Sequence, residues 1–169
     1  MNSYAVAAIV CIFVSIASPS LAAGAPPQLL GKTISASYTA SVPIQSRGRS
    51  SIASRNVHVR IYVSSAGRIF ERTIHEAVTG YLARNNAPGE GLWRFVGGSL
   101  VKSAPAVSGA VRFQISFDSN FASCTLSGIM GHEAGKAYRW KGLDGIDREA
   151  TGPGTISAQS CSIAAGNGL

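Results

Sequence analysis

The chain is poor in acidic residues, in cysteine and in long apolar runs. Of its 169 residues, 8 are Asp or Glu and 3 are Cys, against 15 Lys and Arg. Residues 23–115 carry eleven of the basic side chains and three of the acidic ones, so the positive charge is concentrated there. Such an excess attracts phosphates, acidic glycans or an acidic partner protein. The simpler interpretation is a soluble protein with exposed arginines between its strands.

Only one apolar run is long, and it occupies residues 5–17. Its length of about 13 residues falls short of the roughly 20 that a membrane-spanning helix needs. Pro19 ends the run, and the small residues up to Ala22 fit the cleavage pattern of a secretory signal, although no Lys or Arg precedes the run. We therefore predict a signal peptide over residues 1–22 and one exported domain, periplasmic or secreted, over residues 23–169. No transmembrane segment is expected after signal removal.

Cysteine is scarce enough to make its pairing predictable. Removal of the signal takes Cys11 away and leaves Cys124 and Cys161. In an oxidising compartment two cysteines favour one disulfide, and closing a loop of about 37 residues contributes about 3–4 kcal/mol in the chain-entropy model. A catalytic thiol is the alternative, and a second cysteine in an exported chain argues against it.

The sequence also lacks any long segment with the 3.6-residue period of a helix, and period-two alternation dominates instead. The segments with this alternation or with hairpin signals predict strands. They are residues 33–44, 57–64, 68–74, 92–96, 99–102, 111–117, 121–130 and 155–164. Pro43 indicates an edge or a strand end, and residues 45–54 are interpreted as a polar loop. Residues 75–84 are ambiguous, with a short helical turn as one interpretation.

These segments predict an all-β fold of about seven to eight short antiparallel strands. Residues 131–154 are interpreted as a loop with one weak strand near residues 137–141, and residues 166–169 as a frayed tail. Because consecutive strands pair in order, a small up-and-down barrel is favoured, and a β-sandwich is the alternative.

Several phrases carry a resemblance to a known group. They are Leu30-Gly31-Lys32-Thr33-Ile34, residues 62–70, residues 117–124 and Ser160-Cys161-Ser162-Ile163. In these the chain resembles small exported proteins of alphaproteobacteria, which implies export and pairing of the two cysteines but no activity. More loosely, residues 93–100 look like a hairpin of lipocalin-like barrels, although the ligand-binding residues of that family do not map onto this chain.

Common catalytic patterns are missing. His58, His75 and His132 lack the spacing of a metal site, with His58 expected on a polar strand face and the other two at strand ends or in loops. The carboxylates of residues 131–154 lie in a Gly-rich segment, which is a poor support for an acid–base pair. The chain has no nucleophile elbow and no phosphate loop. No metal or cofactor is expected, and an enzyme is the less favoured interpretation.

Arginines at alternating strand positions offer one candidate binding surface. Arginines and aromatic residues on one sheet face bind anionic sugars or single-stranded nucleic acid, although export makes a nucleic acid an unlikely partner. The candidate anion-binding residues are Arg60, Arg68, Arg72, Arg94 and Arg112, interleaved with Tyr62 and Phe70.

The favoured function is an exported, non-enzymatic binding or interaction protein. Its partner would be an acidic protein, an anionic glycan, a lipid or a small apolar ligand. A periplasmic inhibitor of a hydrolase and an enzyme of unrecognised type are the alternatives. A hollow apolar interior would favour a ligand, whereas a filled core under a basic surface would favour a partner.

Overall fold

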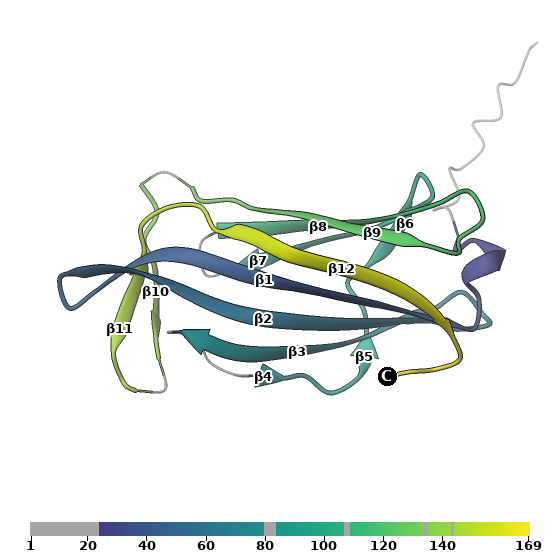
Figure 1. Cartoon of the computed structure of the whole chain (residues 1–169), viewed down its shortest axis with the longest axis horizontal. Coiled ribbons are helices and arrows are strands. Elements are labelled where there is room, and N and C mark those ends of the chain that lie inside the picture. Colours follow the sequence, from purple (N-terminus) through teal and green to yellow (C-terminus); the bar gives the residue numbers. More distant parts are fainter. Residues whose placement is uncertain (1–23, 80–83, 107–108, 134, 143) are drawn as a thin grey trace, which may run out of the picture.

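The alternating segments form antiparallel β-strands in a computed structural model (Figure 1). The structure describes residues 24–79, 84–106, 109–133, 135–142 and 144–169, so the predicted signal peptide lies outside the described residues. A 3-10 turn, η1 (Pro27–Leu29), precedes the strands. The strands are β1 (Lys32–Ser46), β2 (Arg49–Val63), β3 (Ile69–Thr79), β4 (Arg84–Asn85), β5 (Gly89–Glu90), β6 (Arg94–Val96), β7 (Ser99–Ala106), β8 (Gly109–Phe117), β9 (Cys124–Met130), β10 (Tyr138–Lys141), β11 (Asp147–Ala150) and β12 (Thr155–Ala165).

The strands are distributed over two sheets. The first sheet has the order β10-β11-β1-β2-β3-β4, with β12 paired to β1 and β5 paired to β3. The second sheet is the four-stranded meander β6-β7-β8-β9. Within the described residues no ladder of hydrogen bonds joins the two sheets. The all-β antiparallel class is therefore as predicted. The first sheet curves as a half-barrel, and the second sheet packs against its inner face.

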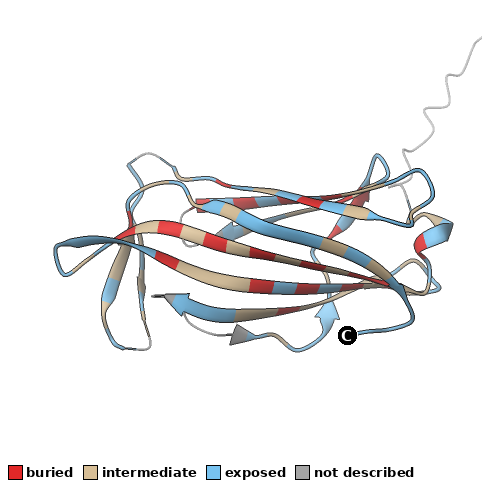
Figure 2. Cartoon of the chain, viewed as in Figure 1, coloured by how far each residue is buried: buried red, intermediate tan, exposed pale blue. Residues whose placement is uncertain are grey.

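The inner faces of both sheets form one hydrophobic core. Along β1 and β2, buried residues alternate with more exposed ones, as Figure 2 shows. From β1 the core takes Ile34 and Val42, from β2 Val57, and from β8 Ile115, all fully or almost fully buried. Burial of one face of each sheet against the other therefore accounts for the fold.

The hairpin between β1 and β2 is longer than predicted, and the expected polar loop over residues 45–54 is wrong. The two strands remain paired from Lys32↔Val63 to Ser46↔Arg49. A two-residue turn joins them, with Arg47 at φ 47° and Gly48 at φ 74°. Positive φ at both positions is the geometry of a tight hairpin turn, and glycine adopts it without steric cost. The arginine-bearing tip therefore projects at one end of the molecule (Figure 1).

Pro43 lies within β1 rather than at its end. On this side β1 pairs with β12 as far as Ser41↔Thr155 and with β11 from Ile44↔Ala150. The carbonyl of Pro43 accepts a hydrogen bond of 2.9 Å from the N–H of Thr151, which lies between those two partners. Pro43 therefore lies at the point where the partner of β1 changes from β12 to β11. No ladder hydrogen bond needs a backbone N–H there, so the proline is tolerated.

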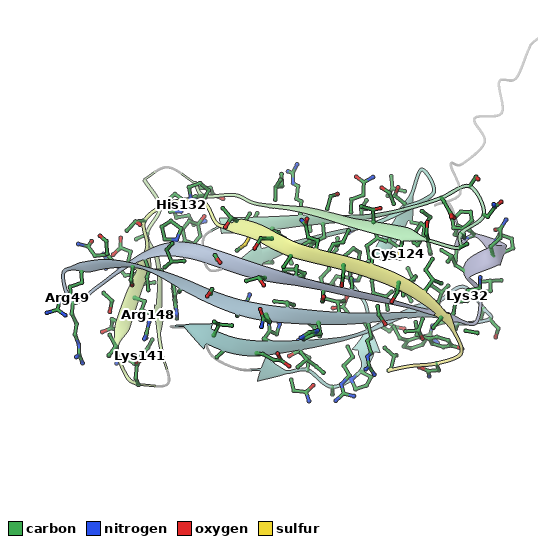
Figure 3. The ribbon with its side chains drawn as sticks, viewed as in Figure 1. Lys32, Arg49, Cys124, His132, Lys141 and Arg148 are labelled. Carbon is green, nitrogen blue, oxygen red and sulfur yellow. A yellow bond between two sulfur atoms is a disulfide. The ribbon has the colours of Figure 1, made fainter. Side chains whose placement is uncertain are left out.

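The predicted disulfide is present between Cys124 of β9 and Cys161 of β12, whose Cα atoms are 5.5 Å apart. It joins the last strand of the second sheet to an outer strand of the first sheet. Figure 3 labels Cys124 on β9 where this strand runs beside β12.

Close packing continues along the same edge. A Cβ atom added to Gly128 would lie 2.6 Å from the Phe113 ring and 2.8 Å from Ile156. The absence of a side chain at this position of β9 therefore allows the side chains of Phe113 from β8 and Ile156 from β12 to pack closely against its backbone.

The structure corrects several smaller expectations. β3 continues to Thr79, so residues 75–79 are strand and not a helical turn, while residues 80–83 lie outside the described residues. The weak strand near residues 137–141 is confirmed as β10, and β11 beside it was missed.

The tail is held in place rather than frayed, because Thr33 Oγ1 donates to the carbonyl of Gly166 and accepts from the N–H of Gly168. No helix among the described residues is long and apolar enough to cross a membrane.

Candidate functional site

A pocket of about 500 Å³ lies between the two sheets. It is bounded by β1, β2 and β3 on one side and by β7, β8 and the end of β9 on the other. Its volume falls within the range of about 300–1,000 Å³ that is typical of small-molecule sites. The residues that line it are Tyr38, Ala40, Arg55, Val59, Glu71, Thr73, His75, Asn86, Leu92, Trp93, Lys102, Ala104, Pro105, Val111, Phe113 and Met130.

One wall of the pocket is aromatic. The ring of Phe113 lies between those of Tyr38, at 4.8 Å between centroids, and Trp93, at 6.2 Å. All three side chains are at least nine-tenths buried. Leu92 also lines the pocket, yet it is 59% exposed and therefore marks its rim. The aromatic wall is a rigid apolar surface, and Leu92 stands where the pocket meets the solvent.

The other wall is polar, although it is built from the inward positions of the strands. Arg55 has the same phase along β2 as the buried Val57, and Lys102 has the same phase along β7 as Leu100. Glu71, Thr73 and His75 occupy the corresponding inward positions of β3. Five polar side chains thus occupy strand positions whose side chains face the core, where alternation predicts apolar residues.

An ion pair links the two sheets at this wall. Lys102 Nζ lies 2.6 Å from Glu71 Oε1, and both side chains are largely buried, with exposed fractions of 14% and 17%. The same ammonium lies 5.8 Å from the centre of the Trp93 ring. A pair withdrawn from water in this way holds two elements in register, because separating the charges would leave each one poorly solvated.

Several buried polar atoms of the pocket have no hydrogen-bond partner among the described residues. They are the indole Nε1 of Trp93, the hydroxyl oxygen of Thr73 and the second carboxylate oxygen, Oε2, of Glu71. Trp93 is 4% exposed and Thr73 is 7% exposed. Buried polar atoms are nearly always paired in folded proteins, so these unpaired groups are a feature of the pocket that its function has to explain.

Burial raises the pKa of the Tyr38 hydroxyl to about 12, and the nearby Arg55 lowers it and Glu71 raises it by smaller amounts. Tyr38 is therefore neutral at physiological pH. It adds no negative charge to the pocket.

The five candidate arginines do not form one surface. Arg60 and Arg72 lie directly opposite one another on the outer face of β2 and β3. Arg94 and Arg112 belong to the second sheet, and Arg68 pairs with Glu90 beside the turn between β2 and β3. Arg60 donates a hydrogen bond of 2.8 Å to the carbonyl of Gly168. The single basic stripe is thus divided, because Arg68 and Arg94 line a separate hollow near Glu90 and Arg60 and Arg72 form a pair of their own.

That pair lines a second hollow of about 430 Å³ on the outer face of the first sheet. His58 lies in this hollow, in line with the expected polar strand face, and its Nε2 is 3.4 Å from Oε2 of Glu76. The small side chains of Ser35 and Ser160 help to form it.

His75 does not lie at a strand end, as predicted, but within β3 and against the inter-sheet pocket. The misassignment arose because residues 75–84 showed no clear alternation. His132 follows β9, as expected for a loop position, and its ring centre lies 5.4 Å from that of Tyr138 in β10.

The acidic residues of the Gly-rich segment form local ion pairs. Asp144 pairs with Arg148 at 2.6 Å and Glu149 with Arg139 at 2.7 Å. Hydrogen bonds from Arg148 hold the pKa of Asp144 well below its usual value. Figure 3 shows Arg148 and Lys141 at the same end of the molecule as Arg49 on the β1–β2 tip.

Across the described ranges, no three His, Cys, Asp or Glu side chains are grouped as metal ligands.

Comparisons with known proteins supply no relative: no family model, no curated protein and no solved structure matches the chain. Its function must therefore be inferred from the pocket and the surface themselves.

Sequence reasoning missed the polar wall of the pocket. The predicted anion-binding arginines occupy the polar phase of the strands, whereas the polar residues of the pocket occupy the apolar phase. The sequence did contain a signal for this wall, namely a charged residue at a position where alternation predicts a core residue. Arg55 is two positions from the apolar Val57, and Lys102 is two positions from the apolar Leu100. Such a charge is costly unless it is paired, so it marks either a buried ion pair or a site.

Proposed function

We propose that this protein binds a small apolar or amphipathic ligand in the inter-sheet pocket and does not transform it. The observation that carries the proposal is the cavity of about 500 Å³ between two otherwise packed sheets, lined by an aromatic wall and by a smaller set of polar groups. Interiors are normally close-packed, so a space of this size bounded by buried aromatic side chains is a feature to be explained. In this proposal the half-barrel and its covering sheet act as the container that a small barrel would provide.

The composition of the pocket supports binding over catalysis. Among its lining residues Glu71 is the one carboxylate, and Lys102 holds it at 2.6 Å. Hydrolysis by paired carboxylates needs a second acid within about 5–10 Å. His75 faces the same space but shares it with this single acid, so the pair that acid–base hydrolysis requires is not assembled there.

Export is part of the proposal. The disulfide between Cys124 and Cys161 supports it, because such bonds persist in oxidising compartments. The pattern of residues 1–22 supports it as well, because it combines a short apolar run with a small-residue cleavage pattern. In this setting the ligand would be met in the periplasm or outside the cell.

The proposal is tested with the neutral fluorophore N-phenyl-1-naphthylamine, whose emission rises in apolar surroundings. We expect saturable binding to the purified protein, and loss of binding in Ala104→Phe, which places a ring in the pocket from β7. Ala110→Phe is the matched control, because Ala110 is exposed on β8 and does not line the pocket. Equal binding by both variants, or no binding by the unaltered protein, would contradict the proposal.

A second candidate function is suggested by the outer hollow, where Arg60 and Arg72 lie opposite one another. It would receive an acidic glycan or an acidic protein, including a hydrolase held in an inhibited state. We expect retention on heparin that falls steeply with salt and is reduced by Arg60→Ser combined with Arg72→Ser. Arg112→Ser is the control on the other sheet, and an equal effect there would leave only non-specific attraction.

A further inference from the structure

The ion pair at the polar wall of the pocket is already balanced. Lys102 Nζ lies 2.6 Å from Glu71 Oε1, and each side chain is more than four-fifths buried, so the two charges neutralise one another. Arg55 and His75 also line the pocket, and each is engaged in an interaction of its own. Bringing a further charge into this largely enclosed space is costly. The pair between Lys102 and Glu71 therefore favours a head group of neither sign.

Unpaired atoms beside this ion pair include both a donor and an acceptor. Within the described parts of the chain, the indole N–H of Trp93, the hydroxyl of Thr73 and Oε2 of Glu71 have no hydrogen-bond partner. The indole N–H can only donate, a carboxylate oxygen can only accept, and a hydroxyl does either. A head group that completes this set therefore has to donate one hydrogen bond and accept another.

These atoms belong to one neighbourhood of the pocket. The ammonium of Lys102 contacts Glu71 and lies 5.8 Å from the centre of the Trp93 ring. Thr73 is two positions from Glu71 on β3, so both side chains are on the inward face of that strand. One head group of a few atoms can therefore meet a donor and an acceptor at the same time.

Residues 91–93 cover the acceptor and supply the donor. A Cβ atom added to Gly91 would lie 3.3 Å from Oε2 of Glu71, so the backbone of Gly91 lies against this oxygen. Leu92 is 59% exposed at the rim of the pocket, and Trp93 carries the indole. None of the three unpaired atoms is open to solvent. Displacement of this short segment would uncover the acceptor and move the donor with it.

We propose that the ligand is an uncharged amphipathic molecule whose head group both donates and accepts hydrogen bonds, as a primary amide does. Its N–H donates to Oε2 of Glu71 once residues 91–93 shift, and its carbonyl oxygen accepts from the indole of Trp93. Its apolar body lies against Phe113 at the centre of the aromatic wall. This inference rests on the proposed function and specifies the ligand class of that same pocket.

The test uses four ligands with similar chains and different head groups. Octanamide donates and accepts, 2-nonanone has a methyl group in place of the amide nitrogen and only accepts, octanoate is an anion and protonated octylamine is a cation. Affinities are measured by isothermal titration calorimetry and by displacement of N-phenyl-1-naphthylamine. We expect octanamide to bind about tenfold more tightly than 2-nonanone, although the ketone is more apolar, because it lacks the hydrogen bond to a carboxylate. Both charged ligands should bind more weakly than octanamide.

Variants locate the head group. Trp93→Phe removes the indole N–H but keeps an aromatic ring, so the affinity for octanamide should fall about fivefold while the fluorophore still binds. Trp140→Phe is the matched control, because it makes the same replacement at the other tryptophan, on β10 and outside the lining of the pocket. Thr73→Val is a second variant, which removes a hydroxyl at nearly constant volume and should also weaken octanamide binding. Its control is the exposed Thr125→Val on β9.

The outcomes separate the two proposals. If neither the fluorophore nor any of the four ligands binds, the proposed function is wrong. If ligands bind but 2-nonanone, octanoate or octylamine binds as tightly as octanamide, the pocket is a binding site and the inference about the head group is wrong. The same conclusion follows if Trp140→Phe weakens octanamide binding as much as Trp93→Phe does, or if neither Trp93→Phe nor Thr73→Val weakens it.

Discussion

The two edges of the space between the sheets are held in different ways. At the disulfide edge, formed by β9 and β12, a covalent bond joins Cys124 to Cys161, and Gly128 allows the strands to approach closely. At the pocket edge, formed by β3 and β7, one ion pair between Glu71 and Lys102 crosses beside a cavity. The comparison shows how two sheets can enclose a cavity without a closed ladder. One edge combines a covalent bond with close packing, and the other combines an ion pair with open space.

The largest effect is expected from breaking the disulfide edge. Replacing Cys124 and Cys161 together by alanine should lower the free energy of unfolding by about 3–4 kcal/mol, because the open loop regains conformational entropy when the chain unfolds. Urea unfolding followed by circular dichroism measures the change. The double variant should still bind the fluorophore in the absence of urea, and a stability unchanged by the substitutions would show that packing alone holds this edge.

The pocket edge should be slightly less sensitive. Lys102→Met leaves the largely buried carboxylate of Glu71 without its partner at 2.6 Å, at an expected cost of about 3 kcal/mol. Replacing both members by glutamine should cost clearly less, because no charge is then stranded. The same urea experiment compares the two variants, and an equal loss for both would show that the charges make no contribution.

Alkaline pH offers a third test, through Tyr38 at the pocket. Burial raises its pKa from the usual 10.0 to about 12. Between these pH values the unfolded chain loses the tyrosine proton while the folded protein keeps it, so stability falls as pH rises. Two pKa units correspond to a loss of about 2–3 kcal/mol. The free energy of unfolding, measured between pH 9 and about 12, should show this loss in the unaltered protein but not in Tyr38→Phe. An equal fall of stability with pH in Tyr38→Phe would show that Tyr38 is not its cause.

The smallest effect concerns packing at the disulfide edge. In Gly128→Ala the new methyl group would lie 2.6 Å from the Phe113 ring, and relief of that overlap should cost about 1–2 kcal/mol. Thermal unfolding provides the comparison, with the exposed Ser127→Ala on the same strand as control. A neutral result at Gly128 would indicate that Phe113 moves into the neighbouring pocket at little cost.

The sequence predicted the parts of this molecule that depend on local alternation. The strands around Ile34, Val59 and Phe113 were found because apolar and polar residues alternate there without exception, and the disulfide followed from having two cysteines left. The division into two sheets depends on β12 returning to β1, which no local pattern encodes. The turn at Arg47 was missed because the polar residues around it resemble a loop although they pair as strands.

The candidate site was less predictable than the fold. Its polar groups come from the β2–β3 hairpin and from β7 of the other sheet, and whether a charge in the apolar phase meets a partner depends on how the sheets face one another. Lys102 and Glu71 are separated by 31 positions and belong to different sheets. Of the five arginines predicted to act together, Arg60 and Arg72 are neighbours because their strands pair in register, and Arg68 and Arg94 line a separate hollow.

The pairing of β1 with β12 has a consequence for synthesis. One side of β1 is occupied by β2, its neighbour in the chain, whereas most of the other side is occupied by β12, from Lys32↔Ala165 to Ser41↔Thr155. The first hairpin can form as soon as residue 63 is available, but it then presents an unpaired strand edge while about 90 further residues are made and β12 emerges. During that interval the unpaired edge of β1 can form hydrogen bonds with a strand of another copy of the chain. The step that closes it is the arrival of the last described strand.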